Sequence, residues 1–137
     1  MDENIRKEIG SRWRNSLQEN LGMEVLSASG ERVEITMPVD ARTQQGAGIL
    51  HGGASLALAE TVAGLGSLVA CQPDETIVGT QVSGNHVAPA LNGDIVRAVG
   101  TIIHCGKTMH VWNVDIFRAD GQLVSTARVV NNVLKKK

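Results

Sequence analysis

The chain has 137 residues, a formal net charge of -1 and an aromatic content of 2%. This length supports one domain, 1–137, with a sizeable core and is too short for two. The basic residues lie mainly at the two ends of the chain rather than in a central stripe, and few aromatic side chains are available to stack on bases. We therefore expect no nucleic-acid partner.

Two cysteines, Cys71 and Cys105, show no CxxC spacing, and the N-terminus is acidic and polar. These features indicate a cytoplasmic, reducing setting in which both thiols are free. The apolar run from Gly46 to Ala70 contains a central glutamate, many glycines and few bulky aliphatic residues. We therefore do not expect it to cross a membrane.

An amphipathic helix is predicted within residues 1–21, followed by two strands within 23–38 that flank a turn at Ser29-Gly30. A polar, glycine-rich loop over 40–49 then leads to a long helix predicted over 52–70. The first helix is indicated by apolar residues at every fourth position: Ile5, Ile9, Trp13 and Leu17.

Four segments rich in Val, Ile and Thr are predicted as strands within residues 76–134. Asn92-Gly93, Gly106-Lys107 and Asp120-Gly121 separate them. Asn-Gly and Asp-Gly accept the positive φ that tight hairpins need, so we expect the four strands to form an antiparallel meander. A sheet with one apolar face needs a cover, and the uncharged helix over 52–70 is the natural one.

One carboxylate, Glu60, lies in the middle of this otherwise uncharged helix. Burying a charge among apolar neighbours is costly unless the charge is paired or used, and no basic residue lies within a turn of it on the helix. We therefore interpret Glu60 as a functional residue, the alternative being a salt-bridged core acid. A carboxylate can accept a proton from water or attack a carbonyl carbon directly, and the sequence does not choose between these roles.

Two glycines, Gly52 and Gly53, begin the same helix. Their unobstructed N–H groups at the positive end of the helix dipole suit a developing oxyanion, with Gly52 as the expected donor. The alternative is that both glycines only allow close helix packing. Glu60 lies eight residues further on, about 12 Å along the axis, too far to act on the same carbonyl. We therefore predict a homodimer with shared active sites, in which antiparallel helices bring Gly52 of one subunit to Glu60 of the other.

The string HGGASLALAE over 51–60, together with the order of elements, resembles the hotdog-fold thioesterases. Within them it is similar to the glutamate-type 4-hydroxybenzoyl-CoA, 1,4-dihydroxy-2-naphthoyl-CoA and phenylacetate-type acyl-CoA thioesterase branch. The resemblance covers residues 22–134. It implies an α+β fold in which a curved, mainly antiparallel sheet of five to six strands wraps a long central helix. It also implies a homodimer whose two sheets join, often doubled to a homotetramer.

The resemblance implies that Gln45 and His51 orient the water or the thioester group beside Gly52 and Glu60. The alternatives are that His51 caps or hydrogen-bonds the loop and that Gln45 is an ordinary polar loop residue. One helix face, formed by Ala57, Glu60, Gly64 and Ser67, carries small side chains that leave room for an acyl group. The substrate-binding residues expected are on this helix and the strand after it: Thr61, Gly64, Ser67, Val82, Asn85 and His86.

The function expected is hydrolysis of an aromatic or medium-chain acyl-CoA to the free acid and CoA, with acyl carrier protein as the alternative donor. Relatives often carry a residue with a hydroxyl group at the position that Gly64 occupies in this chain. A clamp for the phosphates of CoA would fall to His86, Lys107 or Arg97. The alternative functions are a hotdog dehydratase or hydratase and a non-catalytic acyl-CoA-binding module. We expect no cofactor and no metal site, because the histidines and cysteines lack ligand-like spacing.

Overall fold

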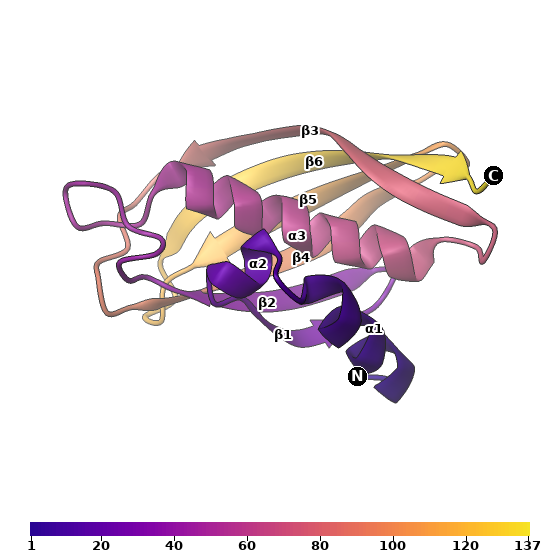
Figure 1. Ribbon diagram of the computed structural model, residues 1–137. Coiled ribbons are helices and arrows are strands. Elements are labelled where there is room, and N and C mark those ends of the chain that lie inside the picture. Colours follow the sequence, from indigo (N-terminus) through magenta and orange to yellow (C-terminus); the bar gives the residue numbers. More distant parts are fainter.

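The computed structural model describes residues 1–137 and shows a long helix, α3, lying across a curved sheet of six strands (Figure 1). All strand pairings are antiparallel, and the strand order is β1-β2-β4-β5-β6-β3. This confirms the expected α+β fold. The elements are α1 (Glu3–Trp13), α2 (Leu17–Asn20), β1 (Glu24–Ala28), β2 (Arg32–Pro38), α3 (Gly52–Ala70), β3 (Glu75–His86), β4 (Ile95–Cys105), β5 (Met109–Phe117) and β6 (Leu123–Lys135).

The core lies between α3 and the concave face of the sheet. Leu58 and Val62 of α3 are fully buried there, and so is Trp112 of β5, where buried and half-buried residues alternate along the strand. A side chain at Gly66 would collide with the Trp112 indole, so this glycine lets the helix approach the sheet closely. By length and composition α3 is apolar enough to cross a membrane, but here its inner side forms the core of a globular fold.

The N-terminal helix is interrupted, so the prediction of one helix within residues 1–21 is wrong. Asn15 takes a left-handed conformation with φ 59°, which ends α1. Ser16 then caps α2, because its hydroxyl oxygen accepts the Glu19 N–H at 3.2 Å. Apolar residues recur at every fourth position on both sides of the break, so the periodicity alone does not reveal it.

The prediction of a four-stranded meander is also wrong, because β3 pairs with β6 and not with β4. Of the four strands predicted for the meander, only β4, β5 and β6 follow one another as hairpins, and β4 has β2 as its other neighbour. Gly93 does adopt the expected positive φ, with a value of 98°, and its N–H donates to the carbonyl of Val39 at 2.8 Å. That turn therefore delivers the chain to the β2 side of the sheet. One edge of β3 has no strand beside it.

Candidate active site

The N-terminus of α3 carries an unpaired backbone donor. His51 Nδ1 accepts the Gly53 N–H at 2.8 Å and so caps the helix, as the capping alternative for this residue supposed. Gly52, the first helical residue, has no helical acceptor for its own N–H, and no loop or side-chain acceptor takes it. The positive end of the α3 dipole thus presents the Gly52 N–H to a ligand.

The imidazole of His86 lies directly against Gly52. A Cβ at Gly52 would come within 2.6 Å of His86 Nε2, so only glycine leaves room for this ring. His86 Nδ1 lies 2.7 Å from the hydroxyl oxygen of Ser125, the residue that faces it across the β3–β6 pairing. Within the chain, Gly52 therefore allows a histidine of β3 to approach closely, and not another helix.

A cavity of about 450 Å³ brings together three of the residues expected in the site, Gln45, Gly52 and His86. Its volume lies within the range of about 300–1,000 Å³ that is usual for small-molecule sites. Gln45 comes from the loop before α3, where its side-chain oxygen accepts the Ala47 N–H at 3.0 Å. Ser125 also lines this cavity, and nothing in the sequence singled it out.

Glu60 lies on the outer side of α3 and is exposed in the single chain, so the expectation that apolar neighbours bury it within the chain is wrong. The apolar residues around it in the sequence point to the sheet, because a helix places consecutive residues on different faces. None of the ion pairs in the chain includes Glu60, which removes the salt-bridged alternative. Glu60 does not line the cavity that contains Gly52 of its own chain.

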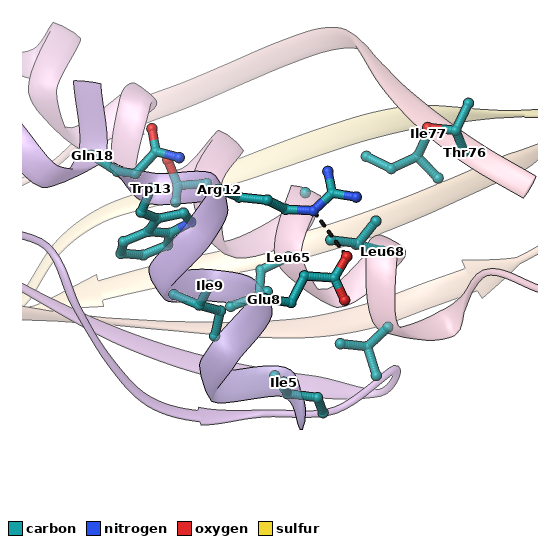
Figure 2. A pocket seen from close by; sticks show the side chains of 13 residues that line it. Ile5, Glu8, Ile9, Arg12, Trp13, Gln18, Leu65, Leu68, Thr76 and Ile77 are labelled. Carbon is teal, nitrogen blue, oxygen red and sulfur yellow. Dashed lines mark hydrogen bonds and ion pairs between the residues drawn. The ribbon is translucent and has the colours of Figure 1, made fainter. Parts of the chain in front are cut away.

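A second cavity, of about 630 Å³, lies between α1 and α3 and is lined by two of the expected substrate-binding residues, Thr61 and Gly64 (Figure 2). The Thr61 hydroxyl donates to the carbonyl of Ala57 at 2.7 Å, and a side chain at Gly64 would meet no atom within 4 Å. We call this cavity the α1–α3 groove. The apolar stripe of α1 predicted that this helix packs as a lid or flank, but not that it lies beside Thr61 and Gly64, because periodicity does not say where a helix packs.

Ser67 is not part of this outer face, because it is fully buried in a polar cluster between α3 and the sheet. Its hydroxyl oxygen accepts the Trp112 Nε1–H at 2.9 Å and an Asn131 Nδ2–H at 3.0 Å. The Ser67 hydroxyl therefore donates its own hydrogen to His110 Nδ1, which lies 2.8 Å away. Burial lowers the pKa of His110. These bonds assign Ser67 to the core and not to substrate binding.

The remaining candidates on the strands are dispersed. Val82 is half-buried and packs against the core, whereas Asn85 is exposed and, by strand alternation, faces away from the side that His86 occupies. Arg97, considered for the phosphates of CoA, is paired with Glu34 at 2.6 Å. The structure therefore concentrates the candidate site at Gln45, Gly52 and His86, with Glu60, Thr61 and Gly64 further along α3.

The comparisons with known proteins agree on one family. A model of the thioesterase superfamily matches residues 47–125. The chain is 38% identical to a 1,4-dihydroxy-2-naphthoyl-CoA hydrolase of Escherichia coli, covering 76% of each protein, and 36% identical to a proofreading thioesterase, EntH, of Cronobacter turicensis, covering 87% of this chain and 86% of that one. A crystal structure of a thioesterase from Haemophilus influenzae superposes with a TM-score of 0.88 at 35% identity, covering 94% of this chain and 90% of that one.

Proposed function

This chain belongs to the thioesterase superfamily and is a thioester hydrolase with a hotdog fold, and we propose that it cleaves an aromatic or medium-chain acyl-CoA to the free acid and CoA. One observation carries this proposal: the unpaired Gly52 N–H at the start of α3, with His86 and Gln45 around it, forms a site suited to a thioester oxygen. The names of the relatives support CoA as the carrier. In this proposal CoA is part of the substrate and the reaction needs no cofactor.

We propose that two subunits share each site. Glu60 lies about 12 Å along α3 from Gly52, and its side chain is exposed on the outer side of the helix. A second α3 packed antiparallel on that side would bring Glu60 of one subunit to Gly52 of the other. The unpaired edge of β3 would let the two sheets join. A dimer is then the smallest active unit, and two dimers can associate into the tetramer that the resemblance implies.

The proposed roles follow from this arrangement. The Gly52 N–H and the α3 dipole stabilise the oxygen of the thioester carbonyl as negative charge develops on it. Gln45, His51 and His86 surround the end of the helix and orient the thioester and the water. Glu60 of the other subunit either accepts the proton of an attacking water or attacks the carbonyl carbon itself. In either case the carbon–sulfur bond breaks and CoA leaves as its thiolate.

The first test is a panel of acyl-CoA thioesters assayed for release of free thiol. It comprises benzoyl, phenylacetyl, hydroxynaphthoyl and C6–C12 acyl groups, with acyl carrier protein thioesters as a second donor. We expect release of CoA from at least one aromatic or medium-chain member, at a kcat of roughly 1–1,000 per second. Hydration of crotonyl-CoA without release of thiol would instead favour a hydratase. Tight binding of acyl-CoA with neither reaction would identify a binding module.

The second test examines whether subunits share a site. We expect the Gly52→Ala and Glu60→Ala homodimers both to be nearly inactive, the first because its new methyl group displaces His86. Unfolding and refolding the two variants together should restore roughly a quarter of the wild-type activity, because half of the dimers formed are heterodimers with one intact site of two. Refolding each variant alone is the control. Failure of the mixture to gain activity would indicate that each site lies within one chain.

A further inference from the structure

The imidazole of His86 turns one particular edge toward the start of α3. A Cβ at Gly52 would lie 2.6 Å from Nε2 and 2.8 Å from Cδ2 of this ring. The other nitrogen, Nδ1, lies 2.7 Å from the hydroxyl oxygen of Ser125. His86 and Ser125 face each other across β3 and β6, and both line the cavity that contains Gly52. The two ring nitrogens therefore have different neighbours, the serine at Nδ1 and the helix at Nε2.

The Ser125 hydroxyl determines which ring nitrogen carries the hydrogen. Ser125 is buried, with 2% of its surface exposed, and His86 Nδ1 is the only hydrogen-bond partner of its hydroxyl group. If Nδ1 donated to the serine oxygen, the hydroxyl hydrogen would be buried without an acceptor, which is costly. The hydroxyl therefore donates to Nδ1. A neutral imidazole whose Nδ1 accepts a hydrogen bond carries its own hydrogen on Nε2.

Two donors then lie close together at the start of α3 without an acceptor for either. The Gly52 N–H has no partner in the chain, and an Nε2 that carries a hydrogen cannot accept it. The Nε2–H of His86 has no partner either, and no carboxylate of the chain lines this cavity. Unpaired donors at the positive end of a helix dipole suit an oxygen on which negative charge develops.

We propose that the His86 Nε2–H is the second donor to the thioester oxygen, and that Ser125 is the residue that positions it. This inference rests on the proposed function and deepens it, because His86 then acts as a donor to the carbonyl oxygen and not as a base. Ser125 does not touch the substrate in this proposal. It acts through His86, by holding the hydrogen on Nε2 and by fixing the rotation of the ring.

The electron pairs move in two steps. When water or Glu60 of the other subunit attacks the carbonyl carbon, the electron pair of the C=O double bond moves to the oxygen. The Gly52 N–H and the His86 Nε2–H then donate to that negative oxygen. When the carbon–sulfur bond breaks, its electron pair leaves with the sulfur of CoA and the C=O double bond forms again. His86 gives up no proton in either step.

The donor at Nε2 is present in both charge states of the ring. A protonated imidazole carries a hydrogen on each nitrogen, so Nε2 donates whether the ring is neutral or charged. Only the neutral form with its hydrogen on Nδ1 lacks the donor, and this is the form that the Ser125 hydroxyl disfavours. Removing the hydroxyl makes that form accessible. The contribution of Ser125 is therefore largest at a pH at which the His86 ring is neutral.

Nitrogen NMR locates the hydrogen without any reaction. In protein labelled with ¹⁵N at histidine, the chemical shift distinguishes a ring nitrogen that carries a hydrogen from one that does not. Comparison with His86→Gln identifies the signals of His86 among the four histidines. With the ring neutral, we expect the hydrogen on Nε2 in wild type and in Glu60→Gln, which excludes a carboxylate of the other subunit as the cause. In Ser125→Ala the Nδ1–H form should appear. A hydrogen on Nδ1 in wild type would overturn the proposal.

Two replacements of His86 distinguish a donor from a base. Glutamine keeps an N–H group, whereas leucine offers neither a donor nor an acceptor, and neither side chain can accept a proton from water. In His86→Leu we expect kcat to fall by about a hundredfold to a thousandfold, the usual loss for one donor to such an oxygen. In His86→Gln we expect a loss of about tenfold or less. KM should change little in both, because the charge develops only in the transition state. Equal losses in the two variants would overturn the donor role.

The effect of Ser125 should depend on pH because it acts through His86. With the ring neutral, we expect Ser125→Ala to lower kcat by about tenfold, part of the loss of a whole donor. The ratio of its kcat to that of wild type should rise as the pH falls, because a charged ring carries a hydrogen on Nε2 again. Taking the ratio removes the titration of Glu60, which both proteins share.

Two further variants complete this comparison. Ser125→Thr keeps the hydroxyl group and should restore most of kcat. Ser83→Ala removes a hydroxyl group from the opposite face of β3 and should leave kcat unchanged, which makes it the matched control. A kcat ratio for Ser125→Ala that stays constant with pH would show a purely structural effect and overturn the positioning role.

These outcomes separate failure of this inference from failure of the proposed function. A hydrogen on Nε2 in a chain that hydrolyses no acyl-CoA would confirm the role of Ser125 toward the ring and refute the proposed function. Hydrolysis by a chain with the hydrogen on Nδ1, or with equal losses in His86→Leu and His86→Gln, would keep the proposed function and refute the second donor.

Discussion

Replacing Glu60 with glutamine is expected to lower kcat for acyl-CoA hydrolysis by roughly a hundredfold to ten-thousandfold, the usual contribution of a positioned proton acceptor. Glutamine has nearly the same shape, but it neither accepts the proton of water nor attacks a carbonyl carbon under these conditions. KM should change little, because the oxygen-binding site around Gly52 remains. Steady-state release of free thiol from the best substrate of the panel measures the effect.

The fold of the Glu60→Gln variant should be preserved. Glu60 is exposed in the single chain and forms no ion pair, so its replacement should change the free energy of unfolding of the chain by no more than about 0.5 kcal/mol. Glu31→Gln, an exposed change in the turn between β1 and β2, is the matched control and should retain full activity. If Glu60→Gln hydrolyses the substrate at a rate within tenfold of wild type, Glu60 has neither proposed role.

Isotope labelling would separate the two roles of Glu60. If the carboxylate attacks the carbonyl carbon, a mixed anhydride forms and water then cleaves it. Repeated turnover in ¹⁸O-labelled water would introduce the label into the Glu60 carboxylate when that water attacks its carbonyl carbon. If Glu60 only accepts a proton, or if water opens the anhydride at the acyl carbon, the label appears in the acid product alone, so label in Glu60 identifies direct attack. Mass spectrometry of the peptide that contains Glu60 distinguishes these results.

Local sequence patterns predicted the individual elements of this fold well and the pairing of its strands poorly. The residues predicted for the central helix, 52–70, are those of α3, and the strands lie close to the predicted segments. Apolar periodicity and turn residues are local signals, so they identify elements. The pairing of β3 with β6 depends on where α3 delivers the chain after crossing the sheet, and no turn residue records this. The Asn92-Gly93 turn therefore predicted the correct φ and the wrong partner strand.

The break at Asn15 illustrates a second limit. The apolar positions before and after it keep the same spacing, although the helix axis ends and restarts there. The only local signal for the break was Asn15 followed by Ser16, a possible helix cap, and both residue types also occur within helices. As a result α1 is an independent short helix, and the α1–α3 groove could not be predicted from the sequence.

At the site, the residues at the start of α3 were predictable because their chemistry is local. A histidine and two glycines before an apolar run mark a helix N-terminus with free N–H groups. The face on which Ser67 lies was not predictable in the same way. It is three residues from Gly64 and seven from Glu60, which suggested one shared face, yet Ser67 is buried and Glu60 is exposed. The curvature of the sheet around α3 decides which residues are covered, and that is a property of the whole fold.

The buried position of Ser67 leads to the second large effect, on stability. In Ser67→Ala, the Trp112 Nε1–H and His110 Nδ1 both lose the hydroxyl group that now satisfies them. Asn131 keeps one bond, because its amide also donates to the carbonyl of Ala63 at 3.2 Å. Buried polar groups without a partner cost about 1–3 kcal/mol each. We therefore expect the free energy of unfolding to fall by about 2–4 kcal/mol, a large part of the total of a typical domain.

Denaturation by urea, followed by circular dichroism, would measure this loss as a lower midpoint at an unchanged slope. Ser83→Ala is the matched control, because Ser83 is exposed on β3 and the same hydroxyl group is removed there without consequence for the core. The comparison isolates burial, since the two substitutions are chemically identical. A loss in Ser67→Ala no larger than that in Ser83→Ala would mean that water enters the cluster and satisfies Trp112 and His110. In that case the polar cluster would not hold α3 against the sheet.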